Sequence, residues 1–171
     1  MGAYYEVNGQ LKPLILKDDR EKTGWEFPED DYFSGTKVQR VLYGDYTIEG
    51  RDDIFLERKN STGEIAYNMI NERFWNLMEN AKPLKYKFII IEADYQDILN
   101  YPLNSQLKPT VWNPTRKRYV TNVATKIKPA FLIECMSRLA VEYGMSVIFA
   151  GSATAAEKAA HSLLKEILKH G

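Results

Sequence analysis

The chain has 171 residues, of which 44% are hydrophobic and 27% charged, enough for one globular domain with its own core. Its 23 basic and 23 acidic residues cancel, so any binding of nucleic acid must depend on a local patch. The single cysteine, Cys135, excludes a disulfide framework, and no apolar run is long enough to span a membrane. We expect one soluble, intracellular domain over residues 1–171, cytoplasmic if the source is prokaryotic or viral.

Strands are predicted for the first part of the chain. The apolar run 11–17 ends in the charged sequence DDRE and is typical of a buried strand. Residues 22–36 are rich in Gly, Pro and acids and predict a loop, followed by a second strand over 37–43. Residues 45–50 and 53–59 predict the two arms of a hairpin.

Helices and strands alternate in the remainder. Apolar residues recur at helical spacing from Ser61 to Ala81, which predicts one helix. The β-branched run YKFIIIEADY (86–95) predicts a strand covered on both faces. Three prolines and no firm period over about 95–126 predict an insertion or long loop. A helix, a short strand and a final helix follow over 128–143, 145–151 and 152–170.

This order favours an α/β fold: a mixed central sheet with an antiparallel hairpin, parallel beyond it and flanked by helices on both faces. The apolar stripes of the last two helices can be buried inside the monomer or between the subunits of a homodimer.

The hairpin predicts a cluster of charged side chains. Side chains alternate between the faces of a strand, so the apolar residues of both arms can share one face: Tyr46, Ile48, Ile54 and Leu56. The opposite face then carries Asp45, Glu57 and Lys59. This pairing requires an odd number of residues in the connecting loop, because a slip by one residue turns one arm over.

Such a cluster suits phosphodiester hydrolysis, although a solvated hairpin edge is the commoner explanation of charges there. Two carboxylates are hard oxygen ligands of the kind Mg²⁺ prefers, and the ion can lower the pKa of water and offset charge on a phosphate. An ammonium at Lys59 can orient the water or stabilise the oxyanion. The sequence DDRE supplies a further acid from Asp18, Asp19 or Glu21.

The motifs DDRE, YGDY and FLERK, followed by a helix and FIIIE, resemble the nuclease domain of XPF-type structure-specific endonucleases, a branch of the PD-(D/E)XK superfamily. The resemblance covers residues 12–169 and implies a restriction-endonuclease-like fold. It also implies cleavage of branched, flapped or forked DNA with Mg²⁺ or Mn²⁺, in repair or recombination, and a homodimer. Catalytic roles are implied for Asp18, Asp45, Glu57 and Lys59, of which the three acids would hold the metal. Arg20, Glu21 and Arg58 are implied as supporting residues.

The chain departs from the family pattern in three ways. Family members often carry an acid four residues after the motif lysine, where this chain has Gly63, with Glu64 next to it. No sequence remains for the tandem helix-hairpin-helix module that commonly accompanies the domain. The segment from Asp94 to Lys126 is longer than the usual connection.

Further basic residues are candidate DNA contacts. Arg116, Lys117 and Arg118, with Trp112 and Tyr119 close in sequence, suit phosphates and bases, although basic loop clusters are usually solvated. Arg73 can either face the scissile phosphate or lie on the surface. Glu92 can be a fourth carboxylate near the metal or a structural hydrogen-bonding group. Two other functions remain open: a catalytically inactive DNA-binding or dimerisation scaffold, and a nuclease without branch specificity.

Overall fold

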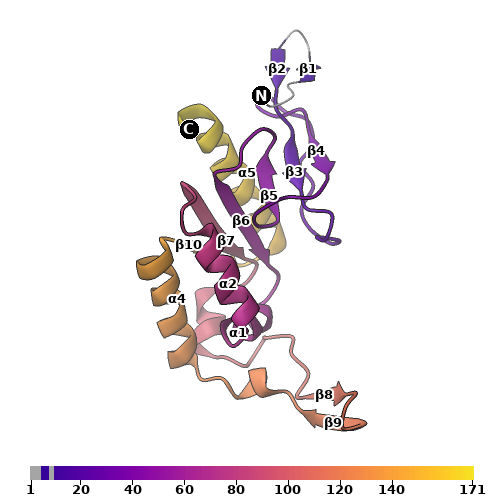
Figure 1. Cartoon of the computed structure of the whole chain (residues 1–171), viewed down its shortest axis with the longest axis vertical. Helices are drawn as coiled ribbons and strands as arrows, with labels where there is room; N and C mark the ends of the chain where they lie inside the picture. The colour runs from indigo at the N-terminus through magenta and orange to yellow at the C-terminus, as the bar shows by residue number, and fades with distance from the viewer. Residues whose placement is uncertain (1–4, 8–9) are drawn as a thin grey trace.

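The computed structural model describes residues 5–7 and 10–171, and its centre is a mixed sheet (Figure 1). Within these residues the sheet has six strands: β3 (Ile15–Lys17), β4 (Thr36–Val38), β5 (Tyr46–Ile48), β6 (Ile54–Lys59), β7 (Tyr86–Ile91) and β10 (Ser146–Phe149). Their order is β10-β7-β6-β5-β3-β4. Strands β10, β7 and β6 are parallel to one another. Strand β5 is antiparallel to both of its neighbours, β6 and β3, and β3 is parallel to β4. The predicted mixed sheet with an antiparallel hairpin is confirmed.

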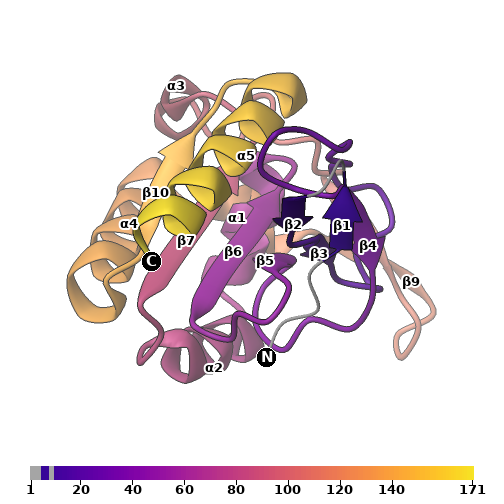
Figure 2. The same cartoon turned by 90° about the horizontal axis from the view of Figure 1, so that it is seen from above.

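Helices cover both faces of the sheet, as the sequence predicts. Helices α1 (Thr62–Met69), α2 (Glu72–Ala81) and α4 (Pro129–Tyr143) pack on one face, and α5 (Ala153–His170) packs on the other (Figure 2). Strand β7 is buried on both sides, because Ile89 and Ile91 join the α4 core whereas Ile90 joins the α5 core. The stripes of α4 and α5 are buried largely within the monomer, through Leu132, Leu139, Leu164 and Ile167.

Three predicted elements differ in the structure. The run 11–17 is divided at Pro13, which has no N–H to donate to a neighbouring strand. Residues before the proline form β2 (Gln10–Lys12), which pairs antiparallel with β1 (Tyr5–Val7). The predicted strand 37–43 is reduced to β4. The single helix over 61–81 is two helices, because the Asn71 side chain accepts a hydrogen bond from the Arg73 N–H and caps a new helix there.

The segment 95–126 has secondary structure of its own. It contains α3 (Tyr95–Leu99), the hairpin strands β8 (Thr110–Asn113) and β9 (Arg118–Thr121), and the 3-10 helix η1 (Val123–Lys126). Figure 1 shows the β8–β9 hairpin projecting from the end of the molecule at which α1 lies. None of the helices in residues 5–7 and 10–171 has both the length and the apolar character needed to cross a membrane.

Candidate functional site

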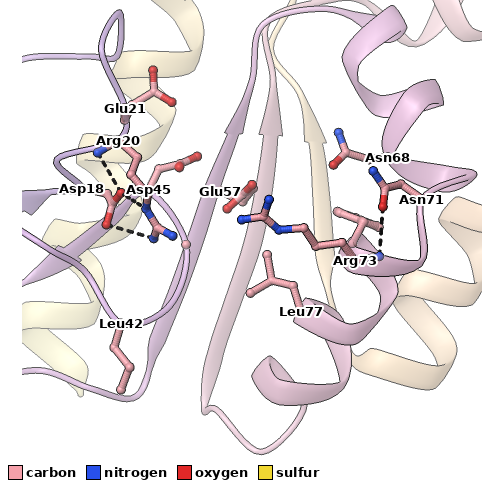
Figure 3. Close-up of a pocket in the computed structure, with 12 residues that line it drawn as sticks. Asp18, Arg20, Glu21, Leu42, Asp45, Glu57, Asn68, Asn71, Arg73 and Leu77 are labelled. Carbon is pink, nitrogen blue, oxygen red and sulfur yellow. Dashed lines mark hydrogen bonds and ion pairs between the residues drawn. The ribbon is translucent and has the colours of Figure 1, made fainter. Parts of the chain in front are cut away.

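The β5–β6 hairpin has the side-chain arrangement that its sequence predicts. Tyr46 pairs with Leu56, and the loop between the strands has five residues, 49–53, the odd number that the pattern requires. The four apolar residues of the two arms share the α5 core: Tyr46, Ile48, Ile54 and Leu56. Asp45 and Glu57 line the same pocket of about 370 Å³ and point toward one another (Figure 3). The predicted convergence of these two carboxylates is therefore present in the structure.

Asp45 is positioned by a close backbone crossing. Gly44 has φ of +73°, and a Cβ there would lie 2.7 Å from the Leu56 carbonyl oxygen, so the position requires glycine. The Asp45 N–H donates to the Leu56 carbonyl at 2.8 Å, and the Asp45 carboxylate accepts from the Arg58 N–H at 2.8 Å. Burial, together with the charge of Glu57, raises the pKa of Asp45 to about 8.

Lys59 holds Glu57 from behind the pocket. Its Nζ donates to Glu57 Oε1 at 2.7 Å and lies 3.4 Å from Glu64 Oε1, so the acid beside Gly63 contacts the motif lysine. Lys59 is 5% exposed and Glu57 8% exposed. Burial opposes the charge on Lys59, but the neighbouring carboxylates, Glu57 first, outweigh it and raise its pKa. Lys59 is therefore an ammonium at neutral pH and not a base.

Asp18 lines the pocket, but its carboxylate is already paired. One oxygen accepts from the Arg20 N–H and from Nε at 2.6 Å, and the other accepts from Arg20 Nη2 and from the Val41 N–H at 2.9 Å. Burial opposes ionisation, and these donors overcome it and lower the pKa of Asp18. Arg20 is thus paired with Asp18, and the supporting role of Arg20 and the role of Asp18 as a metal ligand both stay predictions.

Arg58 braces β6 from its opposite face, and Glu21, which lines the pocket, accepts one of its hydrogen bonds. Arg58 donates to Glu92 through Nε at 2.7 Å and Nη2 at 3.0 Å, and to Glu21 at 3.1 Å. Trp25 donates its indole N–H to Glu92 at 2.8 Å. Because strand residues alternate, Arg58 points away from Glu57 and Lys59. Glu92 therefore has the structural role, and this network fixes the strand that carries the acids.

The opposite wall of the pocket comes from α1, α2 and the turn between them. Arg73 extends from α2 into the pocket toward Glu57 (Figure 3). Asn68 and Asn71 line the same wall and are absent from the sequence-based set. The signal for Asn71 is its position at a helix start, because asparagine is a preferred N-cap. Arg116, Lys117 and Arg118 lie elsewhere, in and beside the exposed β8–β9 turn.

The pocket suits a divalent cation at two of its acids. Across residues 5–7 and 10–171, no three His, Cys, Asp or Glu side chains are arranged to hold a metal. Asp45 and Glu57 nevertheless offer carboxylate oxygens to one space, and their mutual repulsion would be relieved by a cation. Asp45 and Glu57 therefore fit a metal, and Asp18 would have to exchange a bond from Arg20 to join them.

The structure is similar to that of XPF from Aeropyrum pernix, solved alone and in complex with DNA. Both matches have a TM-score of 0.57 and 19% sequence identity. They cover 89% and 92% of this chain, but only 65% and 66% of the XPF chains. No protein-family model and no curated protein matches the sequence. The resemblance to the XPF nuclease fold is confirmed, and it extends to the fold alone.

Proposed function

We propose that the protein is a metal-dependent DNA endonuclease that hydrolyses phosphodiester bonds in branched, flapped or forked DNA. The observation that carries the proposal is the pair of carboxylates, Asp45 and Glu57, facing each other in one pocket with the Lys59 ammonium bonded to Glu57. The XPF nuclease fold supports the reaction class, and the XPF structure in complex with DNA supports the choice of substrate. The preference for branches, the role in repair or recombination and the homodimer rest on the resemblance.

Each residue of the site would have a separate role in hydrolysis. Asp45 and Glu57 would hold Mg²⁺ or Mn²⁺, which when bound lowers the pKa of water and offsets charge on the phosphate. Lys59 holds the Glu57 carboxylate in place through a hydrogen bond, and its ammonium favours negative charge developing nearby. Arg73 reaches in from the opposite wall, where a guanidinium can contact two phosphate oxygens. Asp18 fixes Arg20, which presents a second cation to the pocket.

Cleavage of a panel of labelled DNAs (flap, fork, and blunt duplex) with Mg²⁺, with Mn²⁺ and with EDTA tests the proposal. We expect cutting of flap or fork only with a divalent ion. Asp45→Asn and Lys59→Met should each lower the rate at least about 100-fold, the usual size of a lost catalytic group. The matched controls, Asp52→Asn and Lys85→Met, change exposed residues and should cut normally.

Each alternative predicts a different result. A scaffold binds the DNA panel without cutting any member of it. A nuclease without branch specificity cuts blunt duplex as fast as fork. Full activity of Asp45→Asn would contradict the assignment of the site.

A further inference from the structure

One segment of this neutral chain contains basic residues and no acidic ones. Residues 98–133 contain six Lys or Arg and no Asp or Glu, whereas the rest of the chain contains 17 and 23. The cations of the segment are all exposed: Lys108, Arg116, Lys117, Arg118, Lys126 and Lys128. The segment therefore carries a local positive charge on a molecule whose remainder is acidic, and anionic partners are attracted to it rather than to the whole surface.

The tip of this segment presents two aromatic rings to solvent. Trp112 and Tyr119 are directly paired across β8 and β9, so their side chains share one face of the hairpin. Their ring centroids are 5.4 Å apart at an interplanar angle of 70°, and the side chains are 54% and 70% exposed. Arg116 and Arg118 line a groove that also includes Tyr119. Exposed rings and guanidinium groups thus occur together on a projecting hairpin.

The root of the segment is fixed beside the candidate site. A Cβ at Gly63, in the first turn of α1, would lie 2.2 Å from the Ser105 carbonyl oxygen and 2.6 Å from Leu107 Cγ. Helix η1 also packs on α1. Glu64, the neighbour of Gly63, contacts Lys59. The root of the hairpin therefore lies beside the strand that carries Glu57 and Lys59, and Figure 1 shows the hairpin projecting from the end of the molecule at which α1 lies.

We propose that the β8–β9 hairpin is an arm that binds an unpaired DNA strand next to the pocket. Trp112 and Tyr119 stack on an unpaired base, and Arg116, Lys117 and Arg118 contact its phosphates. An unpaired strand fits these features better than duplex does, because bases inside a duplex present no free face to a ring. The assignment rests on the proposed function for its substrate, DNA, and adds the part of the substrate that this protein recognises.

Binding without cleavage tests the arm. Fluorescence anisotropy in EDTA compares a duplex that has a single-stranded overhang with a blunt duplex of the same length. We expect wild-type protein to bind the overhang DNA more tightly. The double variant Trp112→Ala/Tyr119→Ala should lose about 5- to 150-fold of that affinity, the range for one stacked base, and leave blunt binding unchanged. A 2-aminopurine at the unpaired position should be quenched by wild type and not by this variant.

Matched variants separate stacking and specific phosphate contact from general charge. Tyr95→Ala removes another exposed ring and should change neither affinity. The triple variant Arg116→Ser/Lys117→Ser/Arg118→Ser should flatten the dependence of log affinity on log salt by about 2, near 0.7 for each lost contact to a single strand. Serine at the exposed Lys37, Lys85 and Lys158 makes the same change in net charge and should keep the slope.

Three results would overturn the arm. The first is equal affinity of the wild-type protein for overhang and blunt DNA. The second is an equal loss of affinity for both DNAs in the double aromatic variant, and the third is the same salt slope in the two triple variants. These readouts are independent of cleavage. If the arm binds overhangs as expected while wild type cuts no DNA with any divalent ion, the proposed function is wrong and the arm stands.

Discussion

The carboxylates of Asp45 and Glu57 share a pocket whose remaining wall supplies Arg73 and two asparagine side chains. Burial disfavours the charge on Asp45, the neighbouring Glu57 carboxylate disfavours it further, and the pKa of Asp45 is raised as a result. A divalent cation removes the repulsion between the two carboxylates. The same property that makes the pair costly in the free protein therefore makes it suitable for a metal.

The pH dependence of stability gives a test of the raised pKa of Asp45. The ordinary pKa of Asp45 is 3.8 and the folded-state pKa is about 8, so the folded protein holds this proton more tightly than the unfolded chain. The free energy of unfolding therefore falls as the pH rises from about 4 to about 8, by up to about 1.4 kcal/mol per unit from this group.

Asp45→Asn removes the titration and keeps an oxygen for the Arg58 N–H. In EDTA we expect this variant to be more stable than wild type at pH 8, and the difference to shrink toward pH 4. Urea unfolding at a series of pH values measures it, with Asp52→Asn as the exposed control. A difference that does not depend on pH would show that the pKa of Asp45 is not raised in the folded protein.

Strand parity made Asp45, Glu57 and Lys59 predictable from sequence, because it depends only on neighbours along the chain. The pairing of Asp18 with the Val41 N–H was not predictable in this way, since the loop that carries Val41 returns to β3 only in the folded structure. The pocket wall formed by Asn68 and Asn71 was also missed, because it depends on the break between α1 and α2 and on how the two helices pack against the hairpin.

At the scale of elements, glycine at position 63 has a steric reason. The space beside its Cα is filled by the backbone of the 95–126 segment at Ser105. The next residue, Glu64, contacts Lys59. Helix α1 and the 95–126 segment are therefore packed too closely for a side chain at position 63.

Gly63→Ala tests this packing. The new methyl group would meet the Ser105 carbonyl oxygen at 2.2 Å, so either α1 or the root of the insertion must move. We expect a loss of about 1–3 kcal/mol in the free energy of unfolding, as for other overpacked sites. Hydrogen exchange should speed up in residues 101–126 more than in β6 and β7. Unchanged exchange would mean that the root is not held by Gly63.

The helices and strands that carry strong periodicity were predicted well: β7, α4, β10 and α5 follow their patterns closely. The β8–β9 hairpin within the 95–126 segment was not, because it is exposed on both faces and has no buried stripe to indicate strands. The break between α1 and α2 was hidden because apolar spacing continues through it, and only the capping role of Asn71 marks the new start.

At the scale of the whole molecule, the sheet brings together parts of the chain that are far apart in sequence. The pocket combines residues before β4, residues of the β5–β6 hairpin and residues of α2. A ligand that joins these parts binds only the folded chain, so it must raise the stability of the entire domain. Metal binding is thus measurable without any DNA.

We expect Mg²⁺ or Mn²⁺ to raise the melting temperature of the wild-type protein. At a free concentration about 100-fold above the dissociation constant, the stabilisation is about 2.7 kcal/mol, which for a domain of this size corresponds to about 5–10 °C. EDTA should reverse the shift. Glu57→Gln and Asp45→Asn should each reduce it strongly, because each removes a carboxylate of the pair, whereas Asp52→Asn should keep it. An equal shift in Asp45→Asn and Asp52→Asn would place the bound ion outside the pocket, and calorimetric titration with Mn²⁺ gives the number of ions per chain in each variant.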